Sequence, residues 1–350
     1  MSEEDIKISN ENIFWRITAI WGFSEALLGG VLHALKFPFT GIFIGGTAVI
    51  LISLLARYTE NNYSILKATG VVIIVKGLIS PHTPITAYAA VSLQGLIGFI
   101  LFSFKSFPKI SALLLGIFSL LLSGVQKILI LTIVFGNTLW KSIDLFINYI
   151  LVEIFRFHSI NPDTEFSNII IISYMLIHLA AGILIGLLAG ILPVMLSKES
   201  YKAIPLKETK DENLFNQIYA RKRKHKRWYK RVSAIIFLFM AFSLLVISFF
   251  YAPYGKNVFY EILFMIARSV LILIVWYYIF SPFLIKWFKR IMNKRMNSYA
   301  SEIENIISLF PLFRNIVSFH WKSTNQLKGL GRIKTFLYAS LLSLIREEIN

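Results

Sequence analysis

The sequence predicts an all-α, polytopic integral membrane protein with about eight transmembrane helices. Between Phe14 and Leu196 the chain is an almost continuous series of apolar runs, and runs of about 20 apolar residues are long enough to span a bilayer. Hydrophobic residues make up 56% of the chain, and its mean hydropathy of +0.66 is high for a soluble domain. The basic residues gather mainly in two stretches that follow the apolar runs.

The apolar runs place six helices in an N-terminal bundle and two more in a helical hairpin. Their expected ranges are 14–35, 38–57, 64–80, 84–104, 109–137, 167–197, 232–252 and 260–283. The stretch 138–166 mixes aromatic with charged residues, a pattern typical of a helix in the membrane interface. A lid over the bundle and an ordinary surface helix are both open interpretations of it.

Most of the net charge of +17 lies in two segments, with a net +8 in residues 198–232 and a net +7 in residues 286–350. Basic segments beside membrane helices mark the cytoplasmic side and attract anionic lipid headgroups. No nucleic-acid-binding motif accompanies this charge, so we expect anionic lipids and no nucleic acid as partners. The loop charges predict a multi-pass protein of the cell (inner) membrane with both termini cytoplasmic.

The longest polar stretch divides the chain into three parts. Residues 1–197 form the six-helix membrane unit, 198–232 a basic cytoplasmic linker, and 233–350 two transmembrane helices with a basic tail. Charge interrupts the apolar residues after 286 too often for another span. They predict amphipathic cytoplasmic helices that break at Pro311 and at 329–331.

The first helix carries two stripes at four-residue spacing. The small stripe consists of Gly22, Ala26, Gly30 and Ala34 and allows close approach of another helix, either within the chain or in a partner protein. The polar stripe consists of Trp21, Glu25, Gly29 and His33. A charge near the bilayer centre is costly, so Glu25 faces either a structural partner such as Lys76 or a ligand.

Polar residues recur inside the other apolar runs. Lys76 lies within about one turn of a Pro-bounded outside loop that contains His82, close enough to snorkel to the surface. Gln94, Gln126 and Lys127 are candidates to bind a solute with a carboxylate or phosphate. His178 precedes a glycine ridge at 182, 186 and 190, which is a strong packing signal.

Several chemistries lack a sequence signature. The chain has no cysteine, which excludes disulfides, thiolate metal sites and thiol catalysis. We find no Walker-type phosphate loop, no His-Glu-x-x-His and no Gly-x-Ser-x-Gly. His33 and His178 have no carboxylate or thiolate neighbours in the sequence, so we expect no metal, no cofactor and no enzyme.

The N-terminal 200 residues resemble the substrate-binding S component of energy-coupling factor (ECF) transporters. The similarity lies in six spans with both ends inside, in the small stripe of the first helix, and in the Pro/Gly-marked turn over 36–41. The last 150 residues loosely resemble part of a coupling component, although Ala267-Arg268-Ser269 only partly matches that component's Ala-Arg-Gly signature.

This resemblance implies capture of a vitamin-like or micronutrient-like solute on the outer side, under the loop after the first helix. It implies a transmembrane coupling protein that docks on the small stripe, and ABC-type ATPases that supply the energy. The expected substrate-binding residues are Glu25, His33, Lys76, His82, Gln94, Gln126, Lys127 and His178.

Two other classes stay open. A proton-coupled secondary transporter would use Glu25 with Lys76 or His178 as a protonation relay. A membrane scaffold would recruit a cytoplasmic partner through 198–232 and 286–350, and its buried polar residues would be structural.

Overall fold

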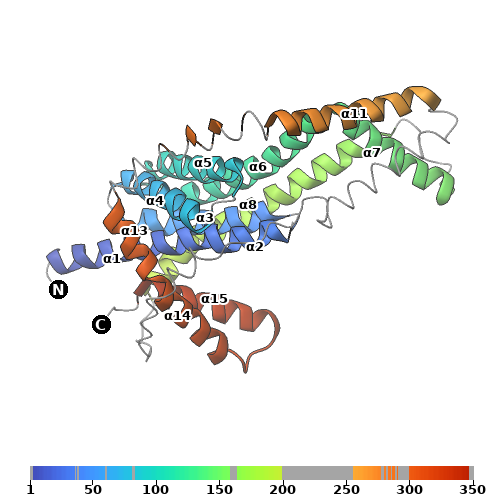
Figure 1. Ribbon diagram of the computed structural model, residues 1–350. Coiled ribbons are helices and arrows are strands. Elements are labelled where there is room, and N and C mark those ends of the chain that lie inside the picture. The colour runs from blue at the N-terminus through green and yellow to red at the C-terminus, as the bar shows by residue number, and fades with distance from the viewer. Residues whose placement is uncertain are drawn as a thin grey trace. The chain divides into compact units, whose positions relative to one another are not determined.

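A computed structural model describes residues 3–157 except 36, 38, 60, 81 and 82, then 164–198, 255–276 and 299–346, with a few positions between 280 and 290. Within these residues the fold is all-helical and contains no β-strand (Figure 1). The all-α prediction is therefore confirmed for the described part of the chain. The predicted span 232–252 and nearly all of the linker 198–232 lie outside it.

The helices follow the predicted apolar runs to within two residues, except for α11 (Gly255–Val275), which begins five and ends eight residues before the predicted 260–283, and except at the N-terminus. There α1 begins at Glu3 rather than near residue 14, because the acidic start of the chain suits the positive end of a helix dipole. The N-terminal helices are α1 (Glu3–Phe23), the π-helix η1 (Ser24–Leu28), α2 (Gly29–Ala34), α3 (Thr40–Tyr58), α4 (Tyr63–Ile79), α5 (Ile85–Phe102), α6 (Pro108–Phe135) and α7 (Asn137–Tyr149). They are followed by a second π-helix η2 (Ile150–Ile154), α8 (Phe166–Lys198), α11 (Gly255–Val275), α13 (Ala300–Ser308), α14 (Phe310–Ser323) and α15 (Gly329–Arg346).

Four of the described helices are long and apolar enough to cross a membrane: α3, α5, α6 and α8. Their outward side chains are apolar, as shown by Phe118 and Ile133 on α6 and by Ile172 and Leu184 on α8, which are 49–67% exposed. An exposed apolar surface of this extent is unfavourable in water and is suited to lipid. The four helices therefore indicate a membrane-embedded protein.

The helices gather into two compact units that are discontinuous in sequence. The first contains the described parts of Met1–Ser123, His178–Arg221 and Lys289–Asn350. The second contains those of Gly124–Ile177 and Lys222–Phe288.

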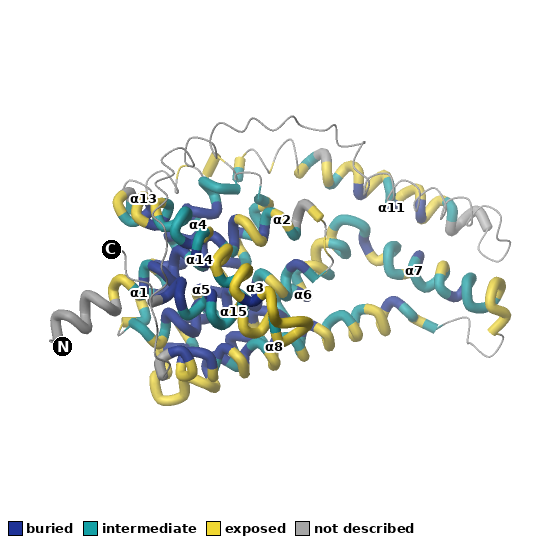
Figure 2. Tube along the Cα trace, turned by 90° about the horizontal axis from the view of Figure 1, so that it is seen from below, coloured by how far each residue is buried: buried dark blue, intermediate teal, exposed yellow. Residues whose placement is uncertain are grey.

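The core of the first unit lies among α1, α3, α4 and α5, where buried residues concentrate (Figure 2). Trp21 of α1, Ile52 and Leu55 of α3, and Val72 of α4 are completely buried there. At 17 residues, α4 is shorter than a usual membrane span, and its buried residues run along most of its length. This helix is therefore enclosed mainly by protein.

A glycine ridge joins α6 to α8 inside the first unit. A Cβ atom added to Gly186 would lie 2.7 Å from the Cα of Leu113, and one added to Gly182 would lie 2.9 Å from the Gly116 carbonyl oxygen. Only glycine allows the two backbones to come this close. The packing role that the spacing predicts is confirmed.

The C-terminal helices α13–α15 pack in the first unit, beside α1 (Figure 1). The ring of Phe23 lies 4.8 Å from that of Phe310 and 5.9 Å from that of Phe313. Lys67 of α4 lies 3.6 Å from Glu302 of α13. The sequence predicts amphipathic helices in this region, and the structure shows which helix their apolar faces cover.

In the second unit, α7 is fixed to the start of α8. The Asp144 carboxylate accepts hydrogen bonds from the backbone N–H and the hydroxyl of Ser167, at 2.6 and 2.9 Å, which caps that helix. Gly136, with φ +73°, makes the turn between α6 and α7, and the Arg268 side chain of α11 lies against it. The stretch 138–166 thus includes a helix held by specific polar contacts.

Candidate functional site

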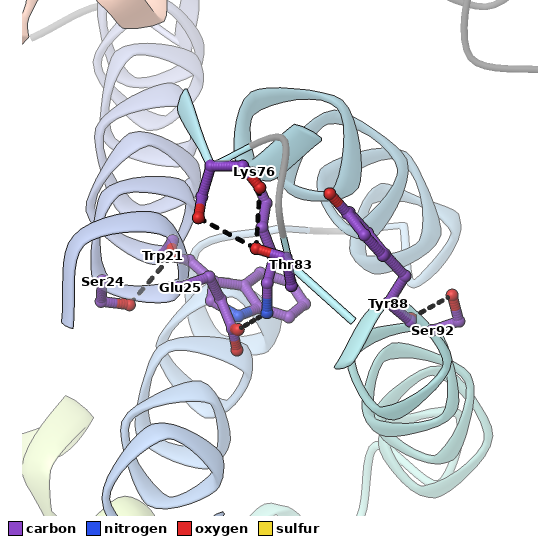
Figure 3. Close-up of polar contacts among 8 residues, drawn as sticks. Trp21, Ser24, Glu25, Lys76, Thr83, Tyr88 and Ser92 are labelled. Carbon is purple, nitrogen blue, oxygen red and sulfur yellow. Dashed lines mark hydrogen bonds and ion pairs between the residues drawn. The ribbon is translucent and has the colours of Figure 1, made fainter. Parts of the chain in front are cut away.

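A buried ion pair joins the first helical segment to α4. The Lys76 Nζ lies 2.6 Å from the Glu25 Oε2, and the two side chains are 2% and 1% exposed (Figure 3). Of the two ion pairs found among the described residues, this is the one that is shielded from solvent; the other, Lys67–Glu302, is partly exposed. Its burial makes it the centre of the candidate site.

Glu25 lies in the π-helical turn η1 between α1 and α2. The backbone N–H of Gly29 donates to the Ser24 carbonyl, five residues back, and the Ser24 hydroxyl donates to the Trp21 carbonyl at 2.9 Å. This wider turn directs Glu25 and Ala26 inward and leaves Leu27 and Leu28 exposed. Single π-turns inside longer helices occur frequently at functional sites.

Two buried polar atoms of the site make no hydrogen bond. One is the second carboxylate oxygen of Glu25, Oε1, and the other is the indole nitrogen of Trp21, one turn earlier. The indole lies near the carboxylate without reaching hydrogen-bond geometry. The site therefore contains a neighbouring acceptor and donor whose hydrogen bond is not formed, in a setting where unmade hydrogen bonds are costly.

Lys76 lies in the last turn of α4, next to the α4–α5 connection. Its carbonyl accepts the Ser80 N–H at 2.8 Å, and the Thr83 hydroxyl donates to the Ser80 carbonyl at 2.8 Å. The Tyr88 ring centroid of α5 lies 6.0 Å from the Lys76 Nζ (Figure 3). Lys76 is held inward and does not snorkel.

The structure places the other predicted substrate-binding residues elsewhere or leaves them undescribed. Gln94 is buried on α5, and its Nε2 would lie 3.1 Å from a Cβ added to Gly45 of α3. His178 is also buried, with its ring 6.3 Å from that of Phe39 in the connection after α2. Gln126 and Lys127 belong to the second compact unit, where Lys127 is exposed.

Two predicted histidines receive no placement of their side chains. His82 lies outside the described residues, and the His33 position is described only as part of the backbone of α2. Of the eight candidates, the structure thus brings Glu25 and Lys76 into direct contact.

The small stripe of the first helix is used inside the chain. A Cβ added to Gly22 would lie 3.1 Å from Val75 of α4, and one added to Gly30 would lie 3.8 Å from the Ser80 hydroxyl. Ala26 is 3% exposed, and the side chain of Ala34 is outside the described set. Of the two open interpretations, intramolecular packing accounts for the described members of the stripe.

Sequence reasoning missed two features of the site. Thr83 lies in the Pro-bounded loop after α4 and Tyr88 in an apolar run, and the approach of the Tyr88 ring to Lys76 depends on how α4 and α5 fold together. The π-turn leaves no mark in the spacing of apolar residues. Outside the site, sequence reasoning also missed the buried Arg16 of α1, 5% exposed, whose place at the start of an apolar run would have revealed it.

Chemically, the site is a buried carboxylate–ammonium pair in which one carboxylate oxygen makes no hydrogen bond. A carboxylate or phosphate of a solute could form an ion pair with Lys76, and a cationic group of a solute could form one with Glu25. Protonation of Glu25 would weaken the pair between the two residues. Within the described residues no group of three or more His, Asp or Glu could hold a metal ion.

The chain matches no protein-family model, no curated protein and no solved structure.

Proposed function

We propose that the chain is the membrane subunit of a small-molecule importer, which captures a small polar solute through Glu25 and Lys76. The observation that supports this most directly is the combination of a π-turn with a buried carboxylate, one oxygen of which makes no hydrogen bond. A chain that needed the pair only for packing would gain by satisfying that oxygen or by replacing both charges with apolar residues. An intramembrane ion pair kept in this state is suited to exchange a partner.

The proposed arrangement in the membrane has about eight spans, with both termini on the cytoplasmic side of the cell (inner) membrane. To the four clearly apolar helices it adds the segment from α1 to α2, the short α4, α11 and the predicted span 232–252. Lys76, near the end of α4, then lies toward the outer side. The solute would enter there and meet the pair beneath the α4–α5 connection.

Energy would come from partner subunits, as in the ECF transporters whose S component the N-terminal region resembles. The absence of a Walker-type loop from the sequence agrees with ATP hydrolysis in trans. A transmembrane coupling protein and ABC-type ATPases are the proposed partners. Because Gly22 and Ala26 are buried against the chain itself, the coupling protein would need to displace a neighbour or use another face.

Native mass spectrometry of the protein purified gently from its own host tests this proposal. We expect a bound metabolite on the wild-type chain, together with ABC-type ATPases. Glu25→Gln should lose the metabolite, whereas Lys67→Met, which removes a partly exposed lysine of the same helix as Lys76, should keep it. A Glu25→Gln protein that is folded by circular dichroism and still carries the metabolite would exclude the proposed site.

A proton-coupled secondary transporter is the second candidate, because protonation of Glu25 would release Lys76 from the one ion pair that it makes among the described residues. Uptake by proteoliposomes under a pH gradient, without any ATPase, distinguishes this class. A membrane scaffold predicts neither metabolite nor flux, and it predicts that Glu25→Gln retains every partner protein.

A further inference from the structure

We propose that the end of the α14–α15 hairpin docks on anionic lipid headgroups of the membrane that holds the chain. We call this surface the hairpin tip and define it as residues 321–337. The inference is independent of solute binding, because it rests on α14, α15 and their connection. It assigns a role to helices that the importer proposal leaves unexplained.

The hairpin tip is a preformed surface. The Trp321 ring of α14 contacts the Phe336 ring of α15 at 5.1 Å, edge to face. Arg332 lies over the Trp321 ring at 4.2 Å and donates from Nη2 to the Trp321 carbonyl at 3.2 Å. Nearer the bundle, the His320 Nε2 lies 2.8 Å from the Ser343 hydroxyl. These contacts fix the two helices against each other.

The two halves of α15 differ in what they cover. Ile345 belongs to the main apolar core and Leu344 to the cluster around Phe23, so the second half of α15 is anchored to the bundle. In the first half, Leu330, Ile333 and Leu337 lie on one helical face and are 85%, 49% and 58% exposed. No described residue covers this face, which is unfavourable for leucine and isoleucine in water.

The charge around this apolar face of α15 indicates what kind of surface would cover it. Residues 305–346 contain six Lys or Arg and no Asp or Glu. Lys322, Lys328 and Lys334 are exposed within the tip, and Lys334 follows Ile333 directly. Apolar side chains interspersed with lysines match the boundary between anionic headgroups and acyl chains. A nucleic acid would leave the leucines uncovered, and the same basic surface of a second copy would repel it.

Because the natural chain has no cysteine, one introduced cysteine labels one position. Leu330→Cys carries an environment-sensitive fluorophore on the full chain, reconstituted in nanodiscs of phosphatidylcholine with or without phosphatidylglycerol. We expect a blue shift and protection from aqueous iodide only with phosphatidylglycerol, and both effects should be lost at high salt. Thr335→Cys, on the opposite face of α15, is the matched control and should remain accessible to iodide in both lipids.

A charge reversal provides the second arm. Each basic residue near an anionic surface strengthens attraction about fivefold, so Lys322→Glu, Lys328→Glu and Lys334→Glu together should weaken docking more than a hundredfold. Lys141→Glu, an exposed lysine on α7, should leave docking unchanged. Equal protection of Leu330→Cys in both lipids, or protection that survives the triple reversal, would overturn anionic lipid as the partner. Full iodide accessibility in both lipids would overturn docking.

Discussion

Two helix pairs of the same unit pack closely by different means. The α6–α8 pair brings backbones together over Gly116, Gly182 and Gly186, and its outward faces are apolar. The pair of α1 and α4 places Gly22 against Val75, and almost one turn further along, in η1, the Glu25 carboxylate is buried in contact with the Lys76 ammonium. Small residues allow approach in both pairs. Among the described residues, only the second pair buries two oppositely charged side chains against each other, and that difference makes it the candidate site.

The largest expected effect comes from breaking the buried pair on one side. Lys76→Met leaves the Glu25 carboxylate buried and uncompensated, which should destabilise the protein by about 3–5 kcal/mol. The double variant Glu25→Leu with Lys76→Met removes both charges and should recover most of that loss. Thermal unfolding in the same detergent measures both. A double variant as unstable as Lys76→Met would show that the pair is not the source of the effect.

The glycine pair should be the next most sensitive. Gly186→Ala places a methyl group 2.7 Å from the Leu113 Cα and 2.8 Å from its carbonyl oxygen, so α6 and α8 must separate. We expect a loss of about 1–3 kcal/mol, without any change in solute binding. Gly70→Ala of α4 is the control, because nothing lies within 4 Å of the added atom. If the two substitutions lowered the unfolding temperature equally, the close approach of α6 and α8 would be disproved.

A second lysine of α4 tests whether burial accounts for the expected effect at Lys76. Lys67 is 42% exposed, pairs with Glu302 at 3.6 Å and lies 4.7 Å from the Trp15 ring centroid. Because solvent screens these contacts, Lys67→Met should cost only about 0.5–1 kcal/mol. Thermal unfolding in the same detergent compares the loss of stability in Lys67→Met with that in Lys76→Met. A loss as large as that of Lys76→Met would mean that burial does not govern the difference between the two lysines.

The smallest effect concerns pH at the C-terminal helices. Burial lowers the pKa of His320 from its ordinary value near 6.5. The unfolded state therefore takes up a proton first as the pH falls, so stability of the α14–α15 hairpin should decrease below about pH 6.5. Amide hydrogen exchange of α14 at pH 7.5 and pH 5.5 measures this, after correction for intrinsic exchange. The change should be absent in His320→Gln.

The sequence predicts some of these features and not others, for physical reasons. Apolar runs report lipid contact directly, so α3, α5, α6 and α8 coincide with predicted spans. Four-residue glycine spacing reports a packing ridge, and a lone carboxylate in an apolar run requires a partner, which Lys76 supplies. The approach of Tyr88 to Lys76 and of Phe310 to Phe23 depends on tertiary packing, and no local pattern encodes it.

The π-turn has a further consequence for relatives of this chain. A π-turn holds one residue more than an α-turn, so it corresponds to a single-residue insertion within an otherwise continuous helix. Deleting one position between 24 and 28 would restore regular winding and rotate Gly29–Ala34 by about 100° around the helix axis. A relative without the insertion would show a one-position gap here in an alignment, and its equivalent of Gly30 would no longer lie beside the equivalent of Ser80.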